Sequence, residues 1–135
     1  MRTSAADRFR QALRRRREIA ITVRGRRTGR KITLPVWYVL DRTTLWLLAV
    51  NGTRTEWFLN VQADPTIVIR AGKQRRTVQG VPLTGRVRVR PVVDRFREKY
   101  GRADVTRYYP RLDAAVKIHL GMPGLAGAAR PRTSR

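Results

Sequence analysis

The sequence predicts a small antiparallel β-barrel, a mainly β fold with added helices. Five or six short stretches have the apolar patterning of strands, and most are joined by connections too short for anything but an antiparallel hairpin. One short helix signal interrupts them between the third and fourth stretches. The 135 residues include 41% apolar ones, which is enough for the core of a single domain. A barrel is favoured over an open sheet because closure removes exposed strand edges.

The N-terminal segment 1–18 is expected to contain a basic amphipathic helix at residues 4–17. Ser4 and Asp7 have the spacing of a helix-capping pair, and Phe9 and Leu13 fall on one face. Four consecutive arginines at 14–17 end the helix, where positive charge interacts favourably with the helix dipole. We interpret this run as a solvated helix end in preference to a phosphate-binding or membrane-binding segment.

Three strands are predicted next, at residues 19–23, 32–40 and 44–50. The second alternates apolar and other residues with a period of two, and its apolar set is Ile32, Leu34, Val36 and Tyr38. The third is apolar almost throughout, which predicts burial on both faces or at a dimer seam. Residues 51–52, Asn-Gly, then turn the chain into the inserted helix.

The inserted helix is expected within residues 53–65, with its helical part at 55–63. Thr53 and Glu56 have the spacing of a capping box. Pro65 ends the helix and pushes Asp64 out of helical geometry. The helix is too short to be stable alone, so tertiary packing must hold it. The side chains expected to supply that packing are Trp57, Phe58 and Val61.

The rest of the chain is predicted to complete the barrel. Residues 66–70 and 76–83 read as a hairpin around 71–74, and 86–90 as an extension of its second strand after a break at 84–85. A helix is expected at 92–100, after Pro91 and before Gly101, and a final strand at 115–120. Residues 1–120 thus form one expected domain, and 121–135 a flexible basic tail.

Composition excludes several kinds of site. The chain has no cysteine and a single histidine, His119, so thiolate zinc sites and a cysteine nucleophile are excluded, and no metal site is expected. No apolar run is long enough to cross a bilayer, and the N-terminus lacks the apolar core of a signal peptide, which predicts a cytoplasmic protein. The 31 basic and 9 acidic residues give a net charge of +22, which favours anionic partners of any class.

The turn at residues 25–31, Gly-Arg-Arg-Thr-Gly-Arg-Lys, is a candidate anion-binding loop. Its glycines allow close approach of the backbone to a ligand, and its cations and hydroxyl can bind a phosphate. It does not have the spacing of a Walker loop, and it joins two strands. Taken alone, it is better described as a basic hairpin turn than as a phosphate-binding loop.

The order of these segments resembles the deazaflavin-dependent nitroreductase and quinone reductase family. The resemblance covers about residues 21–83. It rests on the turn at 25–31, the Leu-Pro pair at 34–35, the strand ending Ala-Val-Asn-Gly at 49–52, and Glu-Trp-Phe-Leu-Asn-Val-Gln-Ala-Asp-Pro at 56–65. It implies a split antiparallel β-barrel related to the FMN-binding split barrels. It also implies a homodimer, and hydride transfer from the reduced coenzyme F420 to a quinone, a nitroaromatic or a similar small acceptor.

The resemblance also implies which residues form the site. The cofactor-binding set comprises Arg26, Arg27 and Thr28 for the phosphate and acidic tail, Leu34 and Pro35 for the deazaflavin pocket, Val50, Asn51 and Gly52 for the ring, and Trp57 and Asn60 for the helix wall. The substrate pocket would include Tyr100, Tyr108 and Tyr109. No catalytic residue is assigned, because the cofactor supplies the hydride. Without the resemblance, Trp57 is equally explained as core and Asn60 as the partner of a nearby backbone group.

Two other functions stay open at this point. A split barrel of this kind can take FMN in place of F420, and the sequence separates the two cofactors poorly. A basic β-barrel can also bind nucleic acid or an anionic surface, including the surface of a membrane. Its contact face would comprise the arginine run at 14–17, Arg86, Arg88, Arg90 and the basic tail. No regular platform of aromatic residues accompanies this basic surface, so the reductase is preferred.

Overall fold

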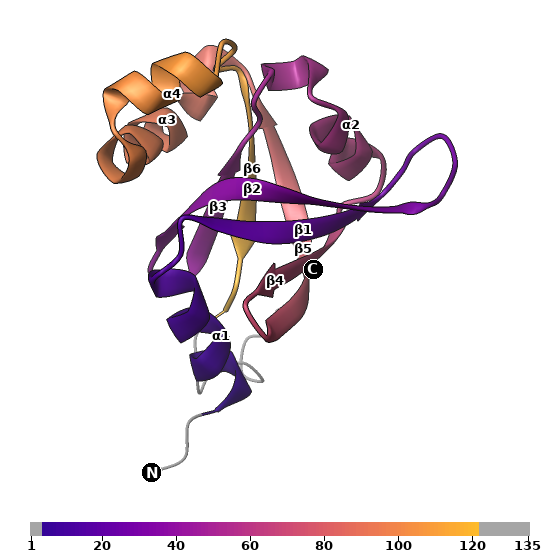
Figure 1. Cartoon of the computed structure of the whole chain (residues 1–135). Coiled ribbons are helices and arrows are strands. Elements are labelled where there is room, and N and C mark those ends of the chain that lie inside the picture. The colour runs from indigo at the N-terminus through magenta and orange to yellow at the C-terminus, as the bar shows by residue number, and fades with distance from the viewer. Residues whose placement is uncertain (1–3, 122–135) are drawn as a thin grey trace.

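A computed structural model describes residues 4–121, and a closed six-stranded barrel forms its centre (Figure 1). The strands are β1 (Glu18–Arg24), β2 (Lys31–Asp41), β3 (Thr44–Leu48), β4 (Thr66–Ala71), β5 (Gln74–Thr84) and β6 (Ala114–His119). They run in the order β1-β2-β3-β6-β5-β4, every neighbouring pair is antiparallel, and β4 pairs with β1 to close the barrel. The predicted fold class is therefore confirmed. The expected tail lies outside the described residues from position 122 onward.

The barrel consists of two sheets that share the long strands β2 and β5. β2 pairs with β1 up to Trp37 and with β3 only from Tyr38 onward. β5 makes the same change from β4 to β6 between Gln79 and Gly80. As a result, no strand within residues 4–121 lies beside residues 31–37 of β2 on the β3 side. This open edge of β2 positions the site described below.

Four helices surround the barrel: α1 (Ala5–Arg14), α2 (Glu56–Ala63), α3 (Arg86–Tyr100) and α4 (Arg102–Tyr108). Figure 1 shows α1 at one end of the barrel, α2 near the other end, and α3 and α4 together on its flank. The predicted start of α1 is confirmed, because the Ser4 hydroxyl accepts a hydrogen bond from the Asp7 N–H at 3.0 Å. Phe9 and Leu13 are buried against the barrel, also as predicted. No helix within residues 4–121 combines the length and apolar character needed to span a membrane.

Two apolar clusters hold these parts together. The first fills the barrel, and the second lies between α3, α4 and the outer face of β2, β3 and β6. β3 contributes to both, since Leu45 and Leu47 belong to the first cluster and Leu48 to the second. The predicted burial of this strand on both faces is confirmed. The packing predicted for α2 is confirmed as well, because Trp57, Phe58 and Val61 are buried in the barrel cluster.

The strand predicted at residues 86–90 is wrong, because α3 begins at Arg86. The alternation of Arg and Val there has the period of a strand, but Val89, Val92, Val93 and Phe96 continue it at helical spacing and are all buried. Gly85, with a φ of 99°, turns the chain out of β5 just before the helix. The expected helix at 92–100 is thus the second part of a longer one that contains Pro91.

The capping box predicted from Thr53 and Glu56 is also wrong. Residues Gly52–Arg54 form a 3-10 turn, and α2 begins at Glu56 after an extended Thr55. The Thr53 N–H donates instead to Oδ1 of Asp113 at 3.0 Å, from a distant part of the chain. The predicted end of the helix is confirmed, since Asp64 is extended, with φ −142° and ψ 106°. Helix α4 was not predicted, because its seven residues are too few for a clear periodic pattern.

Candidate functional site

A cavity of about 680 Å³ lies between α2, α4 and the open edge of β2. Its volume is in the range of pockets that bind cofactors and other small organic ligands. Figure 1 shows α2 and α4 on either side of the barrel end where β3 ends and β6 begins. We distinguish two parts of its lining. The α2 end is lined by Val50, Thr55, Glu56 and Trp57, and the α4 end by Arg17, Asp104, Tyr108 and Tyr109.

Strand β2 forms the wall that joins the two ends. Four successive residues, Leu34, Pro35, Val36 and Trp37, line the cavity. Successive side chains of a strand point to opposite faces of its sheet, so contact with all four means that the cavity runs along the strand edge. Pro35 suits this place, because a residue without an N–H is tolerated at an open edge. Leu34 and Pro35 thus lie where a flat ring could contact the edge.

The α2 end is lined by Val50, Thr55, Glu56 and Trp57. Trp57 is only 5% exposed, whereas Val50 is 47% exposed and projects from the connection between β3 and α2. Val50 and Trp57 therefore join Leu34 and Pro35 as the predicted cofactor-binding residues that contact the cavity directly. Trp57 is at the same time part of the barrel core, so the two explanations of this residue are compatible.

Asn51 and Gly52 shape this end without lining the cavity. The Asn51 N–H donates to the Thr55 hydroxyl at 2.7 Å, and Asn51 forms an isolated bridge with Arg111. Gly52 has a φ of 54°, and a Cβ at this position would overlap the Asp113 carboxylate. Only glycine therefore fits a connection that is packed so closely against the segment before β6.

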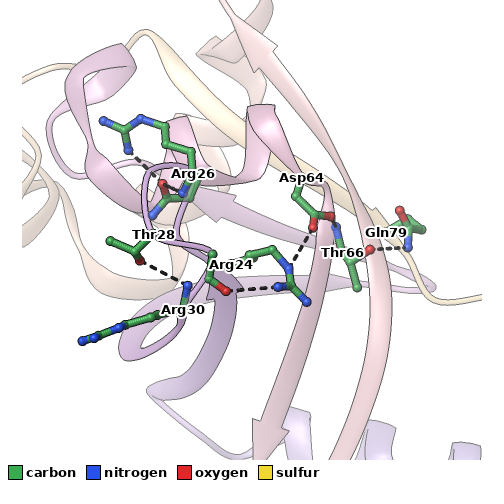
Figure 2. Close-up of polar contacts among 9 residues, drawn as sticks. Arg24, Arg26, Thr28, Arg30, Asp64, Thr66 and Gln79 are labelled. Carbon is green, nitrogen blue, oxygen red and sulfur yellow. Dashed lines mark hydrogen bonds and ion pairs between the residues drawn. The ribbon is translucent and has the colours of Figure 1, made fainter.

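The basic turn between β1 and β2 is joined to α2 by Arg26 (Figure 2). The backbone N–H and Nη1 of Arg26 both donate to Oδ1 of Asn60, at 3.1 and 2.8 Å. Nη1 also lies 3.1 Å from Oε1 of Glu56, which lines the cavity. Asn60 is 4% exposed, so it acts as a buried link between the turn and the helix. The predicted turn residue Arg26 and the predicted helix residue Asn60 are thus direct partners.

The other two predicted residues of the turn point elsewhere. The Thr28 hydroxyl accepts a hydrogen bond from the Arg30 N–H at 3.1 Å, which stabilises the turn itself (Figure 2). Arg27 is exposed, and its side chain has no hydrogen-bond or ion-pair partner within residues 4–121. Arg30 and Lys31 are exposed beside it. The turn therefore presents cations to solvent next to the α2 end of the cavity.

The α4 end is aromatic. Trp37, Tyr108 and Tyr109 line it, and the Trp37 ring centroid lies 5.6 Å from that of Tyr108 and 6.0 Å from that of Tyr109. Tyr108 is 46% exposed, whereas Tyr109 is buried. Burial raises the pKa of Tyr109 well above its ordinary value, so its phenol stays protonated at neutral pH. Trp37 was missed as a site residue because its sequence position indicates only a strand.

Tyr100, the third tyrosine predicted for the substrate pocket, lies behind Trp37 and does not line the cavity. Its ring stacks on Trp37 with centroids 4.2 Å apart and planes at 10°. Its hydroxyl lies 2.6 Å from the Arg17 carbonyl and 2.8 Å from the Tyr38 carbonyl, and accepts from the Tyr38 N–H at 3.1 Å. Burial raises the pKa of Tyr100 to about 12. Tyr100 therefore supports the aromatic wall from behind.

The charged lining consists of the carboxylates of Glu18, Glu56 and Asp104 and the guanidinium of Arg17. Within residues 4–121, no group of three or more His, Asp or Glu side chains is arranged to hold a metal ion. The cavity can bind a flat, largely apolar molecule against the β2 edge, with an acidic tail directed to the neighbouring basic turn.

The chain is similar in sequence to one protein family. The sequence model of the F420H(2)-dependent quinone reductase family matches residues 2–120. No curated protein sequence matches the chain at a significant level.

Solved structures resemble the chain at low sequence identity. An F420-H2 dependent reductase (FDR-A) has 22% identity and a TM-score of 0.60, covering 77% of this chain and 95% of its own. A structure described as a domain-swapped dimer has 21% identity and a TM-score of 0.60, covering 86% and 100%. A putative pyridoxamine 5'-phosphate oxidase from Listeria innocua has 9% identity and a TM-score of 0.63, covering 88% and 95%. These likenesses confirm the predicted split-barrel fold.

Proposed function

Because the chain belongs to the F420H(2)-dependent quinone reductase family, we propose that it reduces a quinone or a similar flat organic acceptor in the cavity beside β2. Membership confirms the predictions that the chain is an F420H2-dependent oxidoreductase and that its cofactor is F420. The nature of the acceptor, the residues that bind each ligand and the oligomeric state belong to the proposal.

The observation that carries the proposal is the unequal lining of the two ends of this cavity. Its α2 end adjoins the exposed cations of the turn at residues 25–31, and its α4 end is aromatic. We assign the deazaflavin ring to the α2 end, against Leu34, Pro35, Val50 and Trp57, and its acidic tail to Arg27. Arg26, Thr28, Asn51, Gly52 and Asn60 then act as positioning residues, because their contacts hold the turn and the connection in place.

The acceptor would lie at the α4 end, against Trp37, Tyr108 and Tyr109. Aromatic rings stack favourably on flat conjugated molecules such as quinones and nitroaromatics. When bound, the reduced cofactor supplies a hydride, so the protein needs only to hold the two molecules in contact and to limit the access of water. Trp37 lies between the two ends on β2, and its stacking on Tyr100 keeps its ring in one orientation.

Titration of oxidised F420 into the protein, followed by cofactor fluorescence, tests this arrangement. We expect saturable binding that Arg27→Ala weakens about tenfold, because a charge-assisted contact with the acidic tail is lost. Arg75→Ala removes an equally exposed arginine from β5 and is the matched control, with little expected change. An equal effect of both substitutions would indicate general attraction to a basic protein and would contradict the assignment of the turn. FMN titrated in parallel should bind more weakly.

Turnover is tested by mixing protein, reduced F420 and menadione and following the oxidation of the cofactor. Faster oxidation with protein than without it is expected, and binding without turnover would contradict the proposed acceptor class. The rival function, a nucleic-acid-binding module, predicts tight and salt-sensitive binding of single-stranded DNA in the same buffer.

We also propose a homodimer. One structural neighbour is described as a domain-swapped dimer, and twofold-symmetric homodimers are the commonest oligomers of soluble proteins. Light scattering on the purified chain should give a mass of about twice 15.6 kDa. A mass equal to one chain at micromolar concentration would rule the dimer out.

A further inference from the structure

Arg17 is the single cation that lines the cavity within the described part of the chain. The other charged groups on the lining are the carboxylates of Glu18, Glu56 and Asp104. This is unusual in a protein with a net charge of +22, whose basic residues outnumber its acidic ones by 31 to 9. An acceptor oxygen at the α4 end that acquires negative charge has Arg17 as its one cationic partner on the cavity wall.

Contacts with three neighbours hold Arg17 at the α4 end. Its Nη2 lies 3.6 Å from Oδ2 of Asp104 on α4. Its Cζ lies 5.3 Å from the ring centroid of Trp37 and 5.1 Å from that of Tyr100. Its backbone carbonyl accepts a hydrogen bond from the Tyr100 hydroxyl at 2.6 Å. The side chain is 63% exposed and has no further hydrogen-bond partner within residues 4–121, so donors stay available to a ligand.

Reduction of a quinone by hydride is favoured by such a cation. The hydride brings two electrons and one hydrogen to the quinone, which becomes the hydroquinone monoanion, and a proton from solvent then completes the hydroquinone. Negative charge therefore develops on an acceptor oxygen during the transfer. A positive group already in place beside that oxygen stabilises the charged state more than the neutral quinone.

We propose that Arg17 binds the acceptor oxygen on which this charge develops, and that Asp104 weakens the interaction by competing for the guanidinium. The proposal rests on the quinone reductase function proposed above and adds the residue that recognises the acceptor. Arg17 lies outside α4 and β2, in the short segment between α1 and β1. Arg17 reaches the cavity because the Tyr100 hydroxyl bonds to its backbone carbonyl and the Tyr100 ring stacks on Trp37, which holds the Arg17 backbone beside Trp37.

Binding of two naphthoquinones of nearly equal shape tests the proposal without turnover. The anion of 2-hydroxy-1,4-naphthoquinone, which is ionised at neutral pH, resembles the charged product, and menadione is its neutral counterpart. Quenching of tryptophan fluorescence measures both dissociation constants in the protein loaded with F420. We expect Arg17→Gln to weaken binding of the anion about tenfold and that of menadione less than about twofold. Arg17→Lys, which keeps the charge, should retain most of the preference for the anion.

The substitution Asp104→Asn distinguishes two roles of Arg17: binding of the acceptor, and an ion pair with Asp104 that only stabilises the structure. If Arg17 binds the acceptor, loss of the competing carboxylate should tighten anion binding about twofold to fivefold, opposite in sign to Arg17→Gln. If the pair only braces α4, both substitutions should weaken binding alike, and the proposal fails. Glu18→Gln is the matched control, because it removes a lining carboxylate that forms no ion pair within residues 4–121.

The failures of the two proposals are distinguishable. If neither naphthoquinone binds the unmodified protein while F420 does, the proposed acceptor class fails and the role of Arg17 fails with it. If both bind, and Arg17→Gln changes their affinities equally, the role of Arg17 alone is overturned. Titration of F420 into each variant should show unchanged affinity, because Arg17 lies at the α4 end.

Discussion

The α2 end of the cavity comes from one continuous stretch of chain, whereas the α4 end is assembled from distant parts. Val50, Thr55, Glu56 and Trp57 follow one another closely in the sequence. Arg17, Trp37 and the residues of α4 lie in three separate segments. A continuous stretch can carry a recognisable motif, and residues 56–65 do so. An assembled wall leaves no local pattern, which is why Trp37 and Arg17 were not predicted as site residues.

The two ends also differ in how they are held. Buried polar contacts fix the α2 end: Asn60 joins α2 to the basic turn, and Asp113 holds the connection before the helix. Ring stacking and one tyrosine hydroxyl fix the α4 end. We therefore expect substitutions at the α2 end to change mainly stability and cofactor affinity. Substitutions at the α4 end should change mainly the affinity for the acceptor.

The largest expected effect is that of Gly52→Ala. The new Cβ would overlap the Asp113 carboxylate, and the backbone would keep a φ of 54° that alanine adopts only with strain. We expect the free energy of unfolding, measured with urea, to fall by about 2–4 kcal/mol. Gly29→Ala is the matched control, because Gly29 also has a positive φ, of 75°, but open space around it. A similar loss in both variants would show that strain alone, and not contact with Asp113, requires glycine at position 52.

A smaller effect is expected from Asn60→Ala. The substitution removes the acceptor of two hydrogen bonds from Arg26, one of them from its backbone N–H. We expect a loss of about 1–3 kcal/mol in the free energy of unfolding, because part-buried donors are left without a partner. F420 affinity should fall with it, as the turn loosens from α2. Gln62→Ala changes an exposed residue of the same helix and should leave both quantities nearly unchanged. Unaltered F420 affinity in Asn60→Ala would contradict the positioning role.

The smallest effect on stability is expected from Tyr100→Phe, which keeps the ring on Trp37 and removes the hydroxyl. We expect a loss of about 1–2 kcal/mol, because the hydrogen bond that the hydroxyl donates to a backbone carbonyl and the one that it accepts from the Tyr38 N–H are both removed. Tyr108→Phe is the control, since the exposed Tyr108 hydroxyl has no hydrogen-bond partner within residues 4–121. A drop in F420 affinity larger than that in acceptor affinity would contradict the division into two ends.

Tyr100→Phe should also change how the free energy of unfolding depends on pH. Folding raises the pKa of Tyr100 from 10.0 to about 12, so the folded state holds its proton where the unfolded state loses it. The stabilisation that Tyr100 provides is therefore complete below pH 10 and is lost as the pH rises toward 12. The decline in unfolding free energy over this interval should be smaller in Tyr100→Phe than in the unmodified protein. An identical decline would show that other groups cause it.

Much of the fold could be predicted because its signals are local. The strand β2, the capping contact of Ser4 and Asp7 and the stop at Pro65 each follow from neighbouring residues, and each is confirmed, although Ile32 of the alternating set in β2 is 42% exposed. The predictions of local structure were wrong where a contact with a distant residue determines the conformation. Thr53 donates to Asp113 instead of capping with Glu56, and Val89 turns toward the apolar cluster under α3 instead of extending β5. In both places a tertiary partner outweighs a weak local preference.

The antiparallel barrel, the inserted helix and the family follow from the chain alone, because periodic patterning, turn residues and an ordered motif are properties of contiguous residues. The open edge of β2, the contact of Arg26 with Asn60, and the contacts of Arg17 and Trp37 with α4 depend on the folded structure. These contacts depend on where β2 changes its pairing partner and on how the helices pack around the barrel. Such long-range packing leaves no periodic pattern in the chain.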